Sequence, residues 1–385
     1  MKGYLNKGEK VGRILVILIA VLVAVYAYLF FYVRRILKTV GAQTKKKRVL
    51  LLCAAITLAI TLLSVNVSFG LIFVVHLAVL AAVWQLVNFI IKRIARKRYT
   101  EGFRLWKTVY GIGVLPLVCT VLVLIIGHIN LHTVVKTDYT VYTDKEIRSE
   151  GYRVALIADV HYGISLDGNE LNEKCDEISS EKPDIVVLCG DIVDNSTTRE
   201  QMNEVFEALG KIDNKLGIYY VYGNHDRSMR FMESGFTDAE LLEAIEKNGI
   251  KVLRDEALQL TDDLALIGRE DESRKNTKEG RKSIDELLSP LDPSDFLLTL
   301  DHQPCEYAQN GKAGTDLLLS GHTHGGHFFP FNLIFRVIKT DDAVYGHTQI
   351  DSDTQAIVTS GFALWGFAAK TAAPSEYVII DITPR

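Results

Sequence analysis

The chain has few cysteines, and its first third has almost no acidic residues. Five cysteines in 385 residues are too few for a disulfide-held scaffold, and none of them shows metal-ligand spacing. Residues 1–137 contain two acidic residues against 19 lysines and arginines, a formal charge of +17, whereas residues 138–385 carry −21. We therefore expect two chemically different domains, 1–137 and 138–385. The strongly acidic second part argues against a nucleic-acid binder, and an apolar content of 48% excludes a disordered chain.

Charged residues are also missing from three long stretches of the first part, at 14–33, 49–91 and 108–135. The middle stretch is long enough for two helices. A transmembrane helix needs about 20 predominantly apolar residues. A cleaved signal peptide would explain only the first stretch, and core helices of soluble proteins rarely carry such long apolar runs. We predict four spans, at about 14–33, 49–68, 71–91 and 109–129.

The orientation of the spans follows from their connecting loops. The loops at 34–48 and 92–107 are rich in lysine and arginine, which favours the cytoplasmic side. The basic N-terminal tail would prefer that side too, but two strong loops outweigh it. We expect a multi-pass protein of a bacterial cell membrane with its acidic part outside the cytoplasm. Membrane lipid is then an expected partner; no protein partner is implied, and no nucleic acid is expected.

The second part alternates strands with helices. Short apolar strands are predicted at 153–158, 184–189 and 217–222, and helices at 170–181, 199–209 and 238–247. This alternation is typical of a mostly parallel, layered α/β core. Later strands predict a second sheet, at 251–254, 257–260, 264–268, 296–300, 315–319, 343–350, 355–360 and 376–382.

Five clusters of acid, amide and imidazole side chains directly follow predicted strands, where the loops of α/β proteins build sites. They are Asp159-Val-His161, Gly190-Asp191-Ile-Val-Asp194, Gly223-Asn224-His225-Asp226, Asp301-His302 and Gly321-His322-Thr-His324-Gly-Gly326. The alternation in the first and last clusters predicts that each pair points to one side of an extended segment.

These clusters predict a metal centre. Oxygen and imidazole ligands without thiolate suit Mn²⁺, Fe or Zn²⁺, and their number exceeds what one tetrahedral ion needs. Two ions about 3.5–4 Å apart, bridged by a carboxylate, would use them all. We predict two divalent ions per chain, with Mn²⁺ favoured. Kinase or ATPase chemistry is disfavoured because the chain has no glycine-rich Gly-Lys-Ser/Thr loop.

The five clusters, in this order, resemble the signature of the calcineurin-like metallophosphoesterases. The bacterial YkuE/YaeI-like branch is the closer resemblance, over about residues 150–383. It rests on four segments: Ala158-Asp-Val-His-Tyr-Gly163, Gly249-Ile-Lys-Val-Leu253, Ser320-Gly-His-Thr-His-Gly-Gly326 and Ser375-Glu376. The resemblance implies an α/β fold, a four-layer α/β/β/α sandwich, here preceded by N-terminal transmembrane helices.

The resemblance also implies roles for individual residues. The first ion would be held by Asp159, His161, Asp191 and His324. The second would be held by Asn224, His302, His322 and the same Asp191, which bridges the two ions.

Other residues of the clusters would act around the ions. His225 would face the leaving oxygen and stabilise or protonate it, while Asp226 would orient His225 or another neighbour of the ligands. Asp194 is expected to fix its loop. Two residues depart from the branch: His327 stands where Gln is common, and Lys370 where Arg is common. Both are candidate substrate contacts, although lysine binds phosphate as a point charge rather than bidentately.

The expected function is that of a membrane-anchored phosphoester hydrolase. Its substrate would be a phosphodiester or pyrophosphate bond of a lipid-linked or envelope molecule, because only residues 136–151 separate the last span from the first catalytic strand. Even fully extended, that segment reaches at most about 50 Å, and part of it is expected to pair as a strand at 139–142. Two alternatives remain: hydrolysis of soluble or cyclic nucleotides, and a noncatalytic membrane scaffold or sensor with a structural metal site.

Overall fold

The computed structural model describes residues 7–66, 68–96, 98–99, 102–227 and 235–385, with side chains described from residue 22 onward. The chain forms two compact units, residues 1–126 and 127–385. The division falls inside helix α6 (Val114–His132), whereas the sequence predicted a domain boundary near residue 138. The last turns of α6 therefore belong to the second unit.

The first unit consists of helices, and among its described residues three helices are long and apolar enough to cross a membrane. The bounds are α1 (Lys7–Thr39), α2 (Lys47–Leu62), α3 (Gly70–Ala95) and α5 (Arg104–Ile112), followed by the start of α6. The candidate spans are Lys47–Val65, Gly70–Ala95 and Val114–His132. They overlap the second, third and fourth predicted spans. The first predicted span, 14–33, is helical within α1, and part of its side chains lie outside the described residues.

Most side chains of the candidate spans are exposed or half-buried, since only 17–33% of each apolar window is buried within the protein. Apolar helices with so much exposed surface need lipid or another apolar phase around them. Their inner faces pack together through Leu29 and Val33 of α1, Cys53 of α2, and Val74 and Leu77 of α3.

The fourth span begins later than predicted. Gly113 takes a left-handed conformation with φ of +65° and ends α5. A side chain there would come within 3.2 Å of Ile36 and Tyr32 of α1. The apolar stretch predicted as one span from about residue 109 is therefore two helices, and only α6 is long enough to cross a membrane.

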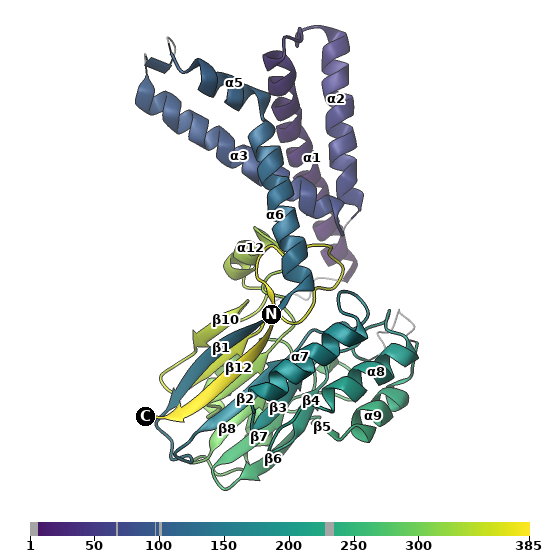
Figure 1. Cartoon of the computed structure of the whole chain (residues 1–385), viewed down its shortest axis with the longest axis vertical. Helices are drawn as coiled ribbons and strands as arrows, with labels where there is room; N and C mark the ends of the chain where they lie inside the picture. The colour runs from purple at the N-terminus through teal and green to yellow at the C-terminus, as the bar shows by residue number, and fades with distance from the viewer. Residues whose placement is uncertain (1–6, 67, 97, 100–101, 228–234) are drawn as a thin grey trace. The chain divides into compact units, whose positions relative to one another are not determined.

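The second unit contains two six-stranded sheets (Figure 1). In order across the first sheet lie β1 (Val134–Thr143), β12 (Ser375–Pro384), β2 (Tyr152–Ile157), β3 (Ile185–Cys189), β4 (Ile218–Val221) and β5 (Ile250–Val252). In order across the second lie β10 (Gly346–Gln349), β11 (Gln355–Val358), β9 (Leu317–Ser320), β8 (Phe296–Leu300), β7 (Leu264–Gly268) and β6 (Glu256–Thr261).

Helices cover both sheets and complete the predicted four-layer α/β/β/α sandwich. The first sheet is covered by α7 (Gly168–Ser180), α8 (Arg199–Leu209) and α9 (Asp238–Lys247). The second packs against α10 (Ile284–Leu288) and α11 (Tyr307–Ala313). A further helix, α12 (Phe331–Ile338), follows β9.

Two separate cores explain why the central strands are apolar throughout. Along β2, Ala155 and Ile157 face the core under the helices, while Val154 and Leu156 face the core between the sheets. Successive side chains of a strand point to opposite faces, so a strand buried on both sides needs apolar residues at every position. The first sheet meets the second through residues such as Leu266, on β7.

The order of the strands also brings the five predicted clusters to the same edges of the two sheets. Strands β2, β3 and β4 are parallel neighbours, and β8 pairs in parallel with β9. Parallel neighbours end at the same edge of a sheet. The loops that follow these five strands carry the five predicted clusters.

Candidate metal centre

The site loops have an unusual backbone. Asp159, His161, Asp191, His322 and His324 all have positive φ angles, between 40° and 72°. Such conformations are uncommon outside glycine and cluster at functional sites, where the surrounding structure holds them. Backbone hydrogen bonds hold two of them here, from the Asp159 N–H to the Gly190 carbonyl and from the His161 N–H to the Asp191 carbonyl, both at 3.0 Å. The segments are therefore not extended, contrary to the prediction; Asp159 and His161 nevertheless come together in one ligand group, whereas His322 and His324 do not.

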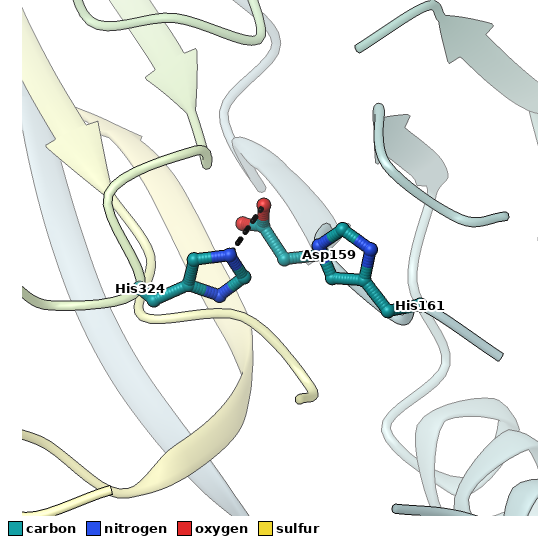
Figure 2. A group of neighbouring side chains, drawn as sticks. All are labelled: Asp159, His161 and His324. Atoms are coloured by element: carbon teal, nitrogen blue, oxygen red, sulfur yellow. Dashed lines mark ion pairs between the residues drawn. The ribbon is translucent and has the colours of Figure 1, made fainter. Parts of the chain in front are cut away.

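A first ligand group consists of Asp159, His161 and His324, all buried. One ligand atom from each lies within 4.8 Å of the others. The His324 Nε2 lies 3.9 Å from a carboxylate oxygen of Asp159, as the dashed line in Figure 2 marks. Asp159 and His161 follow β2 of one sheet, and His324 follows β9 of the other. The group thus joins the two halves of the sandwich.

A second ligand group consists of Asp191, His302 and His322, again with ligand atoms within 4.8 Å of one another. The His302 Nε2 lies 3.2 Å from Asp191 Oδ2 and 3.2 Å from Asn224 Oδ1. Asp191 Oδ2 is also 3.8 Å from the His161 Nε2 of the first group. Asp191 therefore lies between the two groups, as a bridging carboxylate must, and His322 and His324 belong to different groups.

Burial and mutual charge shift the pKa values of these groups. Burial raises the pKa of the Asp159 carboxyl to about 6, although neighbouring His302 opposes the shift. Burial would also raise the pKa of Asp191, but the positive charges of His302 and His161 hold it well below its usual range. Conversely, burial disfavours the charged form of His302, yet Asp191 raises its pKa well above the ordinary value.

The ligand groups fit divalent ions. His161 is completely buried, and among the described residues neither of its ring nitrogens makes a hydrogen bond. Two other ligand histidines use one nitrogen to hold the ring: Nδ1 of His302 contacts the Cys189 carbonyl at 2.7 Å, and Nδ1 of His324 contacts the Ala363 carbonyl at 3.1 Å. Metal-binding histidines have this arrangement, which fixes the ring and leaves Nε2 for the ion.

Two carboxylates shape the loops rather than face the pocket. Asp226 accepts hydrogen bonds from the backbone N–H groups of Asp191 at 2.7 Å, Ile192 at 2.9 Å and Gly223 at 2.6 Å. These bonds hold the bridging residue's loop, so we assign Asp226 to the loop rather than to orienting His225. Asp194 accepts from its own loop at Ser196, and its Oδ2 lies 3.3 Å from His161 Nδ1.

A pocket of about 330 Å³ opens on the ligands, lined by Asp191, His225, His322, Thr323, His324, His327, Phe335, Thr340, Asp341, Val344, Trp365 and Phe367. The His225 backbone donates a hydrogen bond to Asp191 Oδ1 at 2.7 Å, and its ring centroid lies 4.8 Å from that of Trp365. Burial lowers the pKa of His225. His327 lies 5.3 Å from His324, between ring centroids, and burial lowers its pKa to about 4.

Lys370 lies elsewhere. Its side chain is completely buried, and Nζ donates to the carbonyls of Ser360 at 2.5 Å and Gly361 at 2.9 Å. Burial lowers its pKa to about 7. The expected contact between Lys370 and a phosphate does not fit this position, because the ammonium group already bonds to the protein and is shielded from the pocket.

The sequence reasoning missed the apolar wall of the pocket, formed by Phe335, Phe367 and Trp365. Phe335 lies in α12, which was not predicted. One signal was available: residues 331–338 read Phe-Asn-Leu-Ile-Phe-Arg-Val-Ile, with apolar residues at helical spacing.

Comparison with known proteins finds a family model and relatives that match part of the chain. Residues 152–326 match the family model of the calcineurin-like phosphoesterases. The chain is 28% identical over 257 residues to an uncharacterised metallophosphoesterase of Campylobacter jejuni, covering 66% of this chain and 65% of the relative. It is 27% identical to the uncharacterised metallophosphoesterase YkuE of Bacillus subtilis, covering 53% of this chain and 70% of the relative.

A zebrafish relative, from Danio rerio, is named a transmembrane protein with metallophosphoesterase domain; it is 28% identical, with 68% of this chain and 61% of the relative covered. The matches to the Campylobacter and zebrafish relatives span just under two thirds of those proteins' lengths. Residues 152–326 carry a calcineurin-like phosphoesterase domain, which confirms the resemblance for that part of the second unit. The apolar helices of the first unit precede it, as in a membrane protein.

Proposed function

We propose that this protein is a membrane-anchored phosphoester hydrolase with two divalent metal ions. The observation that carries the proposal is the position of Asp191 between two ligand groups at the floor of one pocket. Ions bound there would activate water and neutralise phosphoryl oxygens. Asp159, His161 and His324 would hold one ion, and Asn224, His302 and His322 the other, with Asp191 shared.

The chain's own groups would then position the substrate and stabilise its leaving oxygen. His225 lines the pocket, and its backbone is tied to Asp191, which fixes the ring beside the ligands. Because burial lowers the pKa of His225, its ring is neutral near pH 7 and offers one N–H to the leaving oxygen. Asp226 and Asp194 act indirectly by holding the loop of Asp191 and the ring of His161.

We further propose a lipid-linked phosphodiester or pyrophosphate as the substrate. The pocket has aromatic walls, which suit an amphiphilic molecule better than a fully polar one. Strand β1 begins at Val134, directly after α6 ends at His132, so the catalytic sheet starts where a candidate span stops. This arrangement favours a substrate held at the membrane surface over a soluble nucleotide.

The basic loops at 34–48 and 92–107 favour an extracytoplasmic catalytic domain. A cysteine introduced at the exposed Asn276 tests this orientation. We expect Asn276→Cys to react with a membrane-impermeant maleimide in intact cells. Labelling only after permeabilisation would reverse the orientation and redirect the search to cytoplasmic lipids and nucleotides.

The hydrolase proposal is tested with the purified full chain in lipid nanodiscs. The substrates are a nitrophenyl phosphodiester, a lipid pyrophosphate and a cyclic nucleotide, and metal content is measured on the same sample. We expect two ions per chain and turnover of the diester and the lipid. One ion or fewer under saturating Mn²⁺ contradicts the dinuclear site, and turnover of the cyclic nucleotide alone contradicts the lipid substrate.

A further inference from the structure

Helix α12 presents apolar side chains to its surroundings. Leu333, Ile334, Val337 and Ile338 are all exposed, and Val337 is 80% exposed. Their spacing of three and four residues places them on one face of the helix. We call these four residues the apolar face of α12. The opposite side packs inward, where Phe331 and Phe335 contact each other and Phe335 contacts His327.

The apolar face lies close to the end of a candidate membrane span. The Phe329 N–H, two residues before α12, donates to the Thr371 hydroxyl at 3.0 Å. The neighbouring Lys370 N–H donates to the Gly127 carbonyl of α6 at 2.8 Å, and Asn130 of α6 donates back to the Lys370 carbonyl at 3.1 Å. One short loop therefore connects α12 with the last turns of α6.

Two other exposed apolar residues belong to loops that contact the same end of α6. Ile164 is exposed on the loop whose Ser165 carbonyl contacts the His132 Nδ1 at 3.1 Å. Trp365 is exposed on the loop that leads to Lys370. Contact of these apolar side chains with water is unfavourable, and a bilayer around α6 would cover them. Arg336 and Lys339 are exposed on and after α12, where cationic groups suit lipid phosphates.

We propose that the apolar face of α12 inserts into the bilayer surface and holds the mouth of the pocket at the level of the lipid head groups. The inner side of α12 contributes Phe335 to the pocket, and the residues that follow, Thr340 and Asp341, line it as well. The same helix is therefore both the membrane contact and a wall of the site. The docking needs no catalysis; its consequence for substrate entry depends on the proposed hydrolase function.

The docking is tested by lipid quenching on the full chain in nanodiscs of phosphatidylcholine and phosphatidylglycerol. Val337→Cys carries an environment-sensitive fluorophore, and the lipids carry a nitroxide on the acyl chain. The matched control is Leu242→Cys, an exposed apolar position on α9, on the other side of the unit from α12 (Figure 1). The native chain, whose five cysteines are buried or half-buried, gives the labelling background.

We expect a clear loss of fluorescence at Val337, because an interfacial helix places its apolar face at the acyl-chain boundary, and none at Leu242. Equal quenching at the two positions overturns the proposal. The proposal is also overturned if the lipid nitroxide does not quench the Val337 probe and the probe crosslinks to a second copy of the chain, because α12 would then be a protein contact.

A second measurement connects docking with catalysis. The double variant Val337→Ser/Ile338→Ser should lower turnover of a lipid phosphoester several-fold and leave a soluble diester unchanged. Equal loss on both substrates would show that the face stabilises the fold rather than the membrane contact. If neither protein hydrolyses any phosphoester, the hydrolase proposal fails, while the quenching result still decides the docking.

Discussion

The two ligand groups differ in how their buried charges are balanced by other protein groups. In the second group, Asp191 and His302 form a close pair. Against the effect of burial, His302 lowers the pKa of Asp191 and Asp191 raises the pKa of His302, so each favours the charged form of the other. In the first group, burial raises the pKa of Asp159, and the buried His161 pairs with carboxylates from outside the group, Asp194 at 3.3 Å and Asp191 at 3.8 Å, which raise its pKa against the effect of burial. The second group is largely organised by the charges of its own members, whereas the first is balanced by carboxylates outside it.

This difference has a structural origin. His302 and Asp191 come from neighbouring loops of the two sheets and meet directly, with Asn224 beside them. Asp159 instead receives two contacts from the His322 backbone N–H, at 2.9 and 3.1 Å, and meets His324 only at 3.9 Å. Two sites a few ångströms apart can therefore respond differently to pH and to metal removal.

The largest effect is expected from Asp191→Asn, because this residue belongs to both groups. The amide removes the shared negative charge, so both ions lose affinity and turnover should fall to near background. Metal analysis and turnover on one sample check this. Asp176→Asn, on the exposed side of α7, is the matched control and should change neither. An Asp191→Asn protein that retains two ions would contradict the bridging role.

The next largest effect is expected from His225→Ala, which leaves both groups intact. Turnover should fall about 10²–10⁴-fold, the usual range for losing a group that assists proton transfer, while the metal content stays at two. The loss should shrink for esters with good leaving groups, which need less help. Equal losses for good and poor leaving groups would mean that His225 does not act on the leaving oxygen.

The pH dependence of metal binding should differ between the groups. The pKa of Asp159 is about 6 in the folded protein and near 4 in the unfolded chain, so the folded protein holds the proton more tightly. This proton therefore stabilises the metal-free fold fully below pH 4, and the contribution is lost as the pH rises through about 6. The ion needs the charged carboxylate, so at pH 5 protons should weaken its affinity for the first group by about tenfold. The rise in unfolding temperature on adding Mn²⁺ should thus be about 2–4 °C greater at pH 7 than at pH 5.

Asp159→Asn provides the control for that measurement. With no carboxylate at this position, the Mn²⁺-induced rise should become smaller and its dependence on pH weaker. The remaining dependence comes from the histidine ligands, since Asp194 and Asp191 raise the pKa of His161 against the effect of burial. An unchanged pH dependence in Asp159→Asn would assign the effect to these histidines rather than to Asp159.

Much of this fold could be predicted from the sequence, because its elements have strong local patterns. The predicted helix 238–247 matches α9, where Thr237 caps the start by accepting from the Glu240 N–H. The short helices α10 and α11 were missed, since five and seven residues hold too few turns for a clear period, and α12 was missed although its eight residues have apolar side chains at helical spacing. Strand β1 was predicted only at 139–142, because its full length depends on pairing with the distant β12.

Prediction of the site from the sequence has the same limit. The residue types and their order point to metal binding, but the positive φ angles of Asp159, His322 and their neighbours result from contacts between loops of different strands. The buried position of Lys370 likewise depends on Ser360 and Gly361, which are distant in sequence from the motifs. Local patterns carry no information about such contacts.

The smallest effect is expected from His327→Gln, which introduces the residue that the resemblance to the YkuE/YaeI-like branch implies at this position. His327 lines the pocket but belongs to neither ligand group. Its pKa, lowered by burial to about 4, makes it neutral near pH 7, so replacing it with a neutral amide removes no charge. We expect two ions and a change in turnover of less than about tenfold, with the larger change in KM. His347→Gln, on the exposed strand β10, is the control. If His327→Gln lowers metal content while His347→Gln does not, His327 is a ligand, and the first group extends beyond Asp159, His161 and His324.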